Sequence, residues 1–284
     1  MESSRMVGKV CMVTGANSGI GKVTAEKLVE QGAQVVMVCR NREKGEKAMA
    51  DIKQGSRIGN VELFLSDLAS LASVRELVRA FEESHDALHV LVNNAGLARV
   101  RRSVTGDGFE TTFQVDYLSH FLLTNLLLDL LKKGRPARIV NVSSVGHFGG
   151  HIDFDDLQME KGYGVMKAYS RAKLAQVLFT YELARRLEGT GVTANCLHPG
   201  AVATNIWGAN LGPLSFLGRL SRMFLTSPED GARTSVYLAS SPEVEGVTGR
   251  YFDQGNEKKS SAESYDRAVA EKLWDISAMM TGLA

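Results

Sequence analysis

The sequence predicts an α/β fold in which helices cover both faces of a parallel sheet. Three features predict it: apolar runs alternate with amphipathic stretches, the runs are apolar at nearly every position, and a glycine-rich turn follows the first run. Strands buried on both faces read as continuous hydrophobic runs, and their alternation with helices is typical of parallel sheets. The length of 284 residues fits one large domain, because single α/β domains can reach about 250 residues. We therefore expect residues 1–284 to form one domain.

Strands and helices are expected to alternate along the whole chain. The strands are expected at residues 9–14, 34–39, 61–66, 88–93, 138–143, 192–198 and 250–253. The first helix is expected at residues 18–30, and the second follows the strand at 34–39 and ends at about residue 53. The other helices are expected at residues 73–84, 111–131, 165–188, 228–240 and 265–279. A loop at about 205–227 and a C-terminal tail at about 254–284 complete the chain. Right-handed crossovers then place helices on alternate faces, so the sheet is doubly wound with seven parallel strands.

The composition excludes several classes of protein. With 33 Lys+Arg against 32 Asp+Glu, the net charge of +1 gives no electrostatic footprint for nucleic acid. Cys11, Cys39 and Cys196 lie far apart, which argues against a zinc site or a disulfide framework. They are expected to be buried, reduced thiols of a cytoplasmic protein without a metal.

No membrane segment is expected. The most apolar run, residues 118–131, is interrupted by polar residues. A membrane-spanning helix needs about 20 mainly apolar residues, so this run is interpreted as a buried helix. The first residues also lack the apolar core of a signal peptide.

The turn after the first strand reads Thr14-Gly15-Ala16-Asn17-Ser18-Gly19-Ile20-Gly21. Glycines placed between a strand and a helix allow a tight turn, close approach of a pyrophosphate and close helix packing. The helix N-terminus offers free N–H groups to phosphates. This arrangement predicts a Rossmann fold that binds a dinucleotide. The residues expected to bind it are Gly15, Asn17, Ser18, Gly19, Ile20 and Gly21. A purely structural turn is the alternative.

The end of the second predicted strand indicates which dinucleotide is bound. NAD-binding folds usually carry a carboxylate there, whereas this chain has Arg40, Asn41 and Arg42. A guanidinium matches a phosphate in geometry and charge, which predicts NADP(H) with Arg40 as the first contact. Arg42 or Lys44 would assist, unless the run is only a solvated cluster of charges. Asp67 is placed either to accept a hydrogen bond from the adenine or to cap the next helix.

Tyr169 and Lys173 lie four residues apart on a predicted helix and therefore share a face. A phenol ionises only near pH 10, and a neighbouring ammonium favours the phenolate. The two residues are thus a candidate general acid/base with its activating cation, although a surface pair would show the same spacing. Ser144 precedes Tyr169 by 25 residues and ends a strand, where a hydroxyl can donate to a substrate oxygen.

Together these motifs make the sequence resemble the short-chain dehydrogenase/reductase family over essentially its whole length. The residues that carry the resemblance are Thr14-Gly15-x3-Gly19-x-Gly21, Asn93-Asn94-Ala95-Gly96, Ser144, Tyr169-x3-Lys173 and Pro199-Gly200. Within the family, the segments NVSSVGHFGG, FDDLQ and KLAQVLFTYELARRL are most similar to the retinol-dehydrogenase-like branch.

The resemblance implies a role for each motif. Tyr169 exchanges a proton with the substrate oxygen, Ser144 orients that oxygen, and Lys173 supports Tyr169 and binds the nicotinamide ribose. The further residues expected at the cofactor are Asn41, Asp67, Leu68, Asn93, Ala95, Gly96, Pro199, Gly200, Val202 and Thr204.

One position departs from the family pattern. The fourth catalytic residue is usually an Asn, and here Asp116 occupies its place in Val115-Asp116-Tyr117-Leu118-Ser119-His120-Phe121. An ionised carboxylate accepts hydrogen bonds but cannot donate them. Its negative charge near Lys173 would oppose the activation of Tyr169, so the resemblance leaves the proton relay in doubt.

Other candidate residues follow the catalytic motifs. His147 and His151 are expected at the surface of a loop, and His198 is expected to pack. The loop at 205–227 is rich in apolar residues, which favours a lipophilic carbonyl or alcohol substrate. A packed helix pair is the alternative for this loop. Its apolar side chains are Trp207, Leu211, Leu214, Phe216, Leu217 and Phe224.

The sequence therefore predicts an NADP(H)-dependent oxidoreductase that interconverts an alcohol and a ketone or aldehyde, with a hydrophobic, retinoid-like or lipid-like substrate. A catalytically silent NADP(H)-binding sensor or scaffold is the alternative from another class, and reduction of a carbon–carbon double bond is an alternative within the family. The resemblance also implies a homodimer or homotetramer formed through the helices at 111–131 and 165–188, although a fully buried helix of a monomer would look similar.

Overall fold

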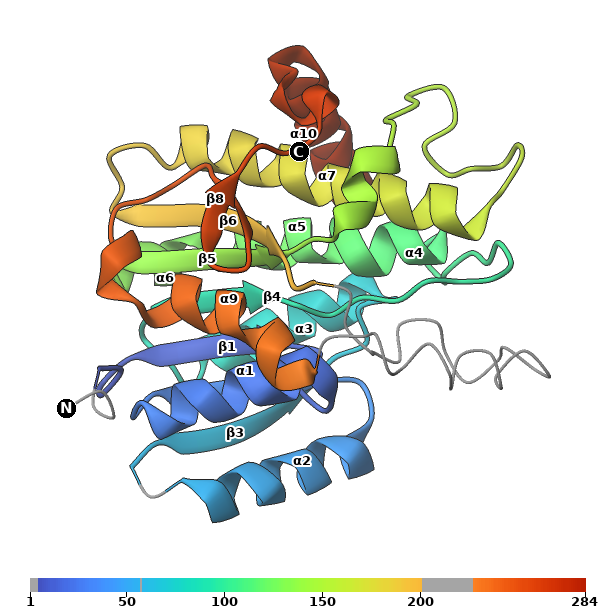
Figure 1. The fold of residues 1–284 in the computed structure, drawn as a ribbon. Coiled ribbons are helices and arrows are strands. Elements are labelled where there is room, and N and C mark those ends of the chain that lie inside the picture. The colour runs from blue at the N-terminus through green and yellow to red at the C-terminus, as the bar shows by residue number, and fades with distance from the viewer. Residues whose placement is uncertain (1–4, 57, 201–226) are drawn as a thin grey trace.

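The computed structural model describes residues 5–56, 58–200 and 227–284 (Figure 1). Within these residues, eight strands form one sheet in the spatial order β3-β2-β1-β4-β5-β6-β7-β8. The strands are β1 (Val10–Thr14), β2 (Gln34–Cys39), β3 (Asn60–Leu65), β4 (Val90–Asn93), β5 (Ala137–Val142), β6 (Val192–His198), β7 (Tyr251–Asp253) and β8 (Asn256–Lys258). The chain builds outward from β1 to β3 and then returns to the other side of β1 with β4. This reversal creates a crevice at the carboxyl ends of β1 and β4, where open α/β sheets bind ligands.

The predicted seven-stranded parallel sheet is confirmed, and an eighth strand extends it. β1 to β7 pair in parallel, whereas β8 pairs antiparallel to β7. The turn between them places Gln254 and Gly255 at φ values of 50° and 77°, as expected for a two-residue hairpin. The sequence predicts only a C-terminal tail here. The three residues of β8 are all exposed, so no apolar alternation marks this strand in the sequence.

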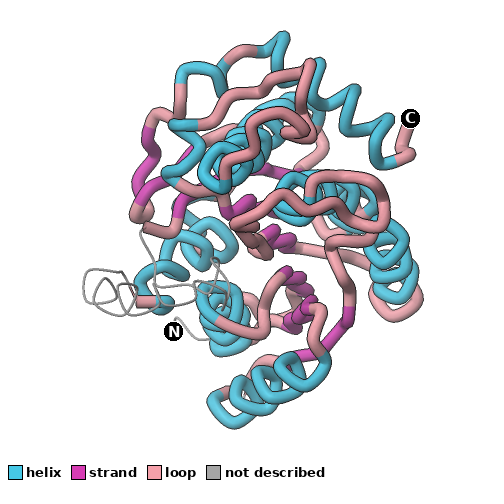
Figure 2. The backbone as a smooth tube through the Cα atoms, turned by 90° about the vertical axis from the view of Figure 1, so that its right-hand side faces the viewer, coloured by secondary structure: helices cyan, strands magenta, loops and turns pink. Residues whose placement is uncertain are grey.

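Helices cover both faces of the sheet, as predicted. On one face lie α1 (Gly19–Glu30), α2 (Arg42–Gly55) and α9 (Pro228–Ser240), and on the other lie α3 (Leu71–Glu82), α5 (Ser119–Leu126) and α7 (Val165–Arg186). Figure 2 shows the strands running between these two helical layers. Side chains of β1 alternate between the two cores, since Met12 packs in one and Cys11 and Val13 pack in the other. The three cysteines are buried free thiols, as predicted.

The helix predicted at 111–131 is interrupted. It consists of α4 (Thr111–Phe113), a π-helical turn (Gln114–Leu118), α5 and α6 (Leu128–Lys133). The predicted burial of this run is confirmed, because Leu118, Phe121, Leu122 and Leu123 are fully buried. Among the helices of the described residues, none combines the length and the apolar character that crossing a bilayer requires. π-helical turns are frequent at functional sites, and this one carries Asp116.

The C-terminal helix α10 (Arg267–Thr281) lies across α7 and α5. The Asp266 side chain caps its first turn by accepting the N–H of Val269, and Gly282 ends it at a φ of 65°. The Trp274 ring contacts the rings of Phe121 and Phe179 at centroid distances of 4.9 and 5.7 Å. α10 therefore packs on both helices through which pairing of subunits is predicted.

Candidate active site

A cavity of about 890 Å³ opens at the carboxyl ends of the central strands. Its lining contains most of the residues predicted from the motifs: Gly15, Asn17, Ser18, Gly19, Ile20, Gly21, Arg40, Asp67, Leu68, Ala95, Gly96, Ser144, Tyr169, Lys173, Pro199 and Gly200. The fold thus brings together segments separated by up to 185 residues at the crevice beside β1 and β4. Val202, Thr204 and nearly all of the predicted substrate loop lie outside the described residues.

The glycine loop has the geometry that a pyrophosphate site needs. Gly15 has a φ of +67°, and a Cβ there would lie 2.9 Å from Cα of Ala95, so the two loops pack backbone against backbone. The side chain of Ser18, the N-cap of α1, makes no capping hydrogen bond, and the first turn of α1 contains no acidic residue. The N–H groups of this turn fit an anionic group, because helix N-termini favour negative charge.

Thr14 and His120 connect this loop to the rest of the site. The sequence motifs did not predict that these two residues make this connection. The Thr14 hydroxyl accepts the N–H groups of Asn94 and Ala95 at 2.9 and 3.0 Å. His120 Nδ1 lies 3.1 Å from the Asp116 carbonyl oxygen, which can only accept, so Nδ1 carries the proton and Nε2 accepts from Thr14 at 3.0 Å. Burial lowers the pKa of His120 to about 3, which keeps the ring neutral.

The residues predicted to choose the cofactor separate into two groups. Arg40 and Lys44 line the cavity, and the Arg40 guanidinium lies 3.9 Å from the Asp67 carboxylate. Arg42 instead pairs with Glu46 at 3.5 Å on the surface of α2. Asn41 caps α2, because its side chain accepts the N–H of Lys44 at 2.8 Å.

Asp67 does not cap the helix that follows it. Its carboxylate accepts the N–H of Ala69 at 3.0 Å, whereas Ser70 caps α3. Of the two roles that the sequence left open for Asp67, the geometry therefore favours contact with a ligand in the cavity.

Asn93 lies behind the cavity wall rather than in it. Its side chain is fully buried and donates to Thr124 and Asn141 at 2.9 and 2.8 Å. Asn141 in turn donates to Thr180 on α7 at 2.9 Å. The ladder ties β4 and β5 to α7, so it fixes the helix that carries Tyr169 and Lys173.

Ser144 and Tyr169 meet around Gly146. A Cβ at Gly146 would lie 3.4 Å from the Ser144 hydroxyl oxygen and 3.2 Å from a ring carbon of Tyr169. The Ser144 oxygen accepts the N–H of Gly146 at 3.1 Å, which orients the hydroxyl so that its hydrogen can be donated elsewhere. Lys173 Nζ lies 5.5 Å from the centre of the Tyr169 ring.

Among the described residues, the Lys173 ammonium donates to the Val142 carbonyl at 3.2 Å and to Gln176 Oε1 at 3.0 Å. It also forms an ion pair with Asp116, with Oδ2 at 3.3 Å. An ammonium has three N–H bonds, so one N–H remains for a further acceptor. The role of Gln176 was not predicted, although its place three residues after Lys173 on the same helix could have indicated it.

Asp116 is placed beside Lys173 by the π-helical turn. The carboxylate is fully buried, and Oδ1 accepts the N–H of Leu97 at 2.8 Å. Burial raises the pKa of Asp116 to about 6, although Lys173 and the Leu97 N–H favour the ionised form. A proton-exchanging group is therefore held within 3.3 Å of the lysine.

The three histidines near the site differ in their surroundings. His151 is exposed, as predicted, with 75% of its side chain accessible. His198 is partly buried: Nδ1 accepts the N–H of Gly200 at 3.0 Å, and Nε2 lies 3.0 Å from a carboxylate oxygen of Asp253. Our expectation for His147 was wrong, because its side chain is fully buried against Phe148 and Tyr251. Sequence position alone could not reveal this, since Tyr251 lies more than 100 positions later in the chain.

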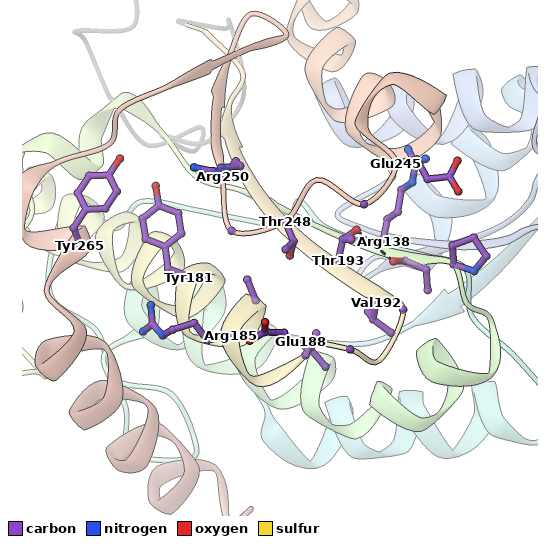
Figure 3. A pocket seen from close by; sticks show the side chains of 18 residues that line it. Arg138, Tyr181, Arg185, Glu188, Val192, Thr193, Glu245, Thr248, Arg250 and Tyr265 are labelled. Carbon is purple, nitrogen blue, oxygen red and sulfur yellow. Dashed lines mark hydrogen bonds between the residues drawn. The ribbon is translucent and has the colours of Figure 1, made fainter.

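A second cavity of about 750 Å³ lies at the opposite ends of β5 and β6 (Figure 3). Three arginines line it, but each has protein partners. Arg138 donates to the carbonyl oxygens of Leu238 and Ser241, Arg250 pairs with Glu257 at 3.2 Å, and Arg185 pairs with Glu182. This cavity holds none of the predicted site residues.

Comparisons with known proteins agree with this geometry. Residues 9–211 match the family described as short chain dehydrogenase. Human retinol dehydrogenase 14 is 47% identical to this chain, over 98% of this chain and 88% of the relative. The crystal structure of an uncharacterized protein from Mycobacterium paratuberculosis is 34% identical with a TM-score of 0.80, over 97% of this chain and 94% of that chain.

A further solved structure is similar and holds a cofactor. The Pseudomonas aeruginosa RhlG/NADP active-site complex is 25% identical with a TM-score of 0.69, over 89% of this chain and 97% of that chain. The family match covers most of the described chain, including the glycine loop, Ser144, Tyr169 and Lys173. This protein therefore belongs to the short chain dehydrogenase family of oxidoreductases.

Proposed function

We propose that the protein is an NADP(H)-dependent oxidoreductase that interconverts an alcohol and a ketone or aldehyde. The observation that carries this proposal is the meeting of Ser144, Tyr169 and Lys173 in one cavity with the glycine loop. The cavity therefore combines a fit for a dinucleotide with a group that can exchange a proton. A nicotinamide bound there supplies or accepts the hydride.

The protein's own residues handle the proton and the substrate oxygen. Ser144 donates its hydroxyl hydrogen to that oxygen, because the N–H of Gly146 already occupies a lone pair of the hydroxyl. Tyr169 gives a proton to the oxygen during reduction and takes it back during oxidation. The Lys173 ammonium beside the ring favours the negative charge that forms on Tyr169.

The preference for NADP(H) rests on Arg40 and Lys44. Both line the cavity at the end of β2, where a carboxylate would favour NAD. The side chain of Arg40 is 66% exposed, so its guanidinium can turn toward a phosphate. The RhlG complex, which contains NADP, supports the proposal.

The substrate that we propose is hydrophobic, with a retinoid or another lipid as the first candidates. Val145 and Met166 line the cavity beside Ser144 and Tyr169 and are about half exposed, as is Phe148 next to them. Exposed apolar side chains at a cavity mouth favour an apolar ligand. The name of the similar human protein, retinol dehydrogenase 14, supports the same class.

The test combines a substrate panel with Tyr169→Phe. We expect the wild type to oxidise NADPH with retinal or long-chain aldehydes and to prefer NADPH over NADH in kcat/KM. Tyr169→Phe should lower kcat by about 10²–10⁴-fold, the usual size of general acid–base catalysis, while NADPH still binds. Product analysis separates carbonyl reduction from reduction of a carbon–carbon double bond.

The ion pair between Asp116 and Lys173 favours a second candidate function, a catalytically silent NADP(H)-binding sensor. In this pair the Asp116 carboxylate binds the ammonium that Tyr169 needs. NADPH binding without turnover on the whole panel, and no effect of Tyr169→Phe, would support the sensor and overturn the enzyme.

A further inference from the structure

A C-terminal segment lies against the loop that carries Ser144. Residues 260–265 connect β8 to α10, and the serine loop, residues 144–152, connects β5 to the region before α7. The two segments are more than 100 residues apart in sequence. Three hydrogen bonds join them. The histidine that makes one of these bonds also contacts the carbonyl group of Ser144.

His147 makes the central connection. Its Nδ1 lies 2.7 Å from the Ser144 carbonyl oxygen, and its Nε2 lies 3.1 Å from the backbone nitrogen of Ser261. A carbonyl oxygen only accepts and a backbone N–H only donates, so the ring is neutral with its proton on Nδ1. Burial lowers the pKa of His147, in agreement with this assignment. Both ring nitrogens are fully used.

Glu263 makes the other two connections. One carboxylate oxygen accepts the N–H of Ile152 at 2.9 Å, and the other lies 3.0 Å from Nδ1 of His151. The carboxylate is one-quarter exposed. Glu263 therefore holds the far end of the serine loop, as Ser261 holds the near end through His147.

The C-terminal segment is itself attached to α7. The hydroxyl of Tyr181 lies 2.7 Å from the Ser260 hydroxyl, and the N–H of Ser260 donates to the Tyr265 hydroxyl at 3.1 Å. The rings of Tyr181 and Tyr265 stack at 5.4 Å. α7 carries Tyr169 and Lys173. The segment therefore connects the serine loop to the helix that holds the other two catalytic groups.

We propose that residues 260–265 form a clasp that positions Ser144 relative to Tyr169, with His147 and Glu263 as positioning residues. Val145 and Phe148 on the serine loop are 55% and 53% exposed, so the loop packs on α7 mainly through its backbone, where a Cβ at Gly150 would lie 2.4 Å from the Ser170 carbonyl oxygen. Without the Ser261 N–H, the His147 ring loses the hydrogen bond at Nε2, and its Nδ1–H is held less firmly at the Ser144 carbonyl oxygen. The catalytic consequence rests on the proposed function, whereas the structural consequence does not.

Ser261→Pro tests the clasp, with Ser261→Ala as its matched control. The φ of Ser261 is −62°, which proline adopts, so the substitution removes the N–H without moving φ. Ala keeps the N–H and removes a hydroxyl that has no hydrogen-bond partner among the described residues. We expect amide exchange in residues 144–150 to become about tenfold faster in Ser261→Pro and to stay unchanged in Ser261→Ala.

Kinetics give the second readout. In Ser261→Pro, kcat should fall about tenfold or more, because small misplacements of catalytic groups are costly, while the Kd for NADPH stays within twofold. A general loss of structure would change both. Equal exchange rates in the two variants would overturn the clasp. No turnover by the wild type together with the expected exchange result would reject the proposed function and keep the clasp.

Glu263→Ala keeps the proposal testable if the proline variant fails to fold. Glu257→Ala is its control, because Glu257 is exposed on the neighbouring β8 and pairs only with Arg250 among the described residues. Exchange at residues 150–152 should become faster in Glu263→Ala alone. The same exchange in both variants would show that the clasp does not hold the serine loop.

Discussion

The buried Lys173 ammonium has two neutral hydrogen-bond acceptors and one charged ion-pair partner among the described residues. The Gln176 and Val142 oxygens orient the ammonium, whereas Asp116 also competes for its charge. An ionised Asp116 weakens the support that Lys173 gives to a negative Tyr169. A protonated Asp116 leaves that support intact. The protonation of Asp116 is therefore coupled to the chemistry proposed for Tyr169.

Asp116→Asn removes this coupling. Because the pKa of Asp116 is about 6, the wild-type carboxyl is neutral below that pH and ionised above it. Asn keeps an oxygen for the Leu97 N–H but carries no charge. We expect alcohol oxidation to be retained or faster above pH 6, with the acidic limb of the kcat profile moved to lower pH, because Tyr169 must lose its proton to act as the base. A pH–rate series with alcohol and NADP measures this.

Asp129→Asn is the control for this experiment, because Asp129 is an exposed carboxylate on α6 that pairs with Lys132. Its pH–rate profile should match that of the wild type. An unchanged profile in Asp116→Asn would show that Asp116 takes no part in the proton relay.

Arg40 and Arg42 are two positions apart but face different surroundings. Arg40→Ala should raise the Kd for NADPH about tenfold or more, the size of a lost hydrogen bond between charged groups, and change the Kd for NADH less than twofold. Arg42→Ala should leave both unchanged, because Arg42 pairs with Glu46 on α2. Fluorescence titration with each cofactor measures the four values. Equal weakening of NADPH and NADH binding would contradict a phosphate contact at Arg40.

At the scale of single elements, the π-helical turn Gln114–Leu118 is the feature that local sequence signals missed. The run from 111 to 131 is apolar and predicts one continuous helix. The turn points the Asp116 side chain at the N–H of Leu97 and at Lys173. Those partners lie on other elements, so nothing within the run itself indicates the interruption.

The C-terminal helix α10 is held by an aromatic contact that can be tested. Trp274 packs on Phe121 and Phe179, and the Arg186 guanidinium lies 4.2 Å from its ring centre. Trp274→Ala should lower the free energy of unfolding by about 3 kcal/mol, the lower end for removal of a large aromatic side chain. Met279→Ala, on the same helix and 64% exposed, should change it by less than about 0.5 kcal/mol. Urea unfolding gives both values, and a similar loss in the two variants would argue against the packing role of Trp274.

On the scale of the whole molecule, the sheet separates two cores that serve different parts of the site. The core with α1, α2 and α9 supports the glycine loop, and the core with α3, α5, α7 and α10 supports the catalytic residues. The predicted homodimer or homotetramer stays a prediction, as does the cytoplasmic location. α10 packs on the helices at 111–131 and 165–188 within the same chain.

The sequence by itself determined the order of strands and helices, the two-layer covering of a parallel sheet, and the identity of most cavity-lining residues. It could do so because glycine loops, strand ends and i to i+4 pairs are local patterns with local physical causes. Ser144, Tyr169, Lys173 and Arg40 all carry such signals.

Only the tertiary structure decided which groups surround these residues. It placed Asp116 and Gln176 on Lys173, joined Thr14 to His120, and buried His147 under the C-terminal segment. It also assigned Asn41 to a helix cap and packed α10 on α5 and α7. Each of these outcomes depends on contacts between segments far apart in the chain, where burial and hydrogen-bond partners are set by packing rather than by neighbouring residues.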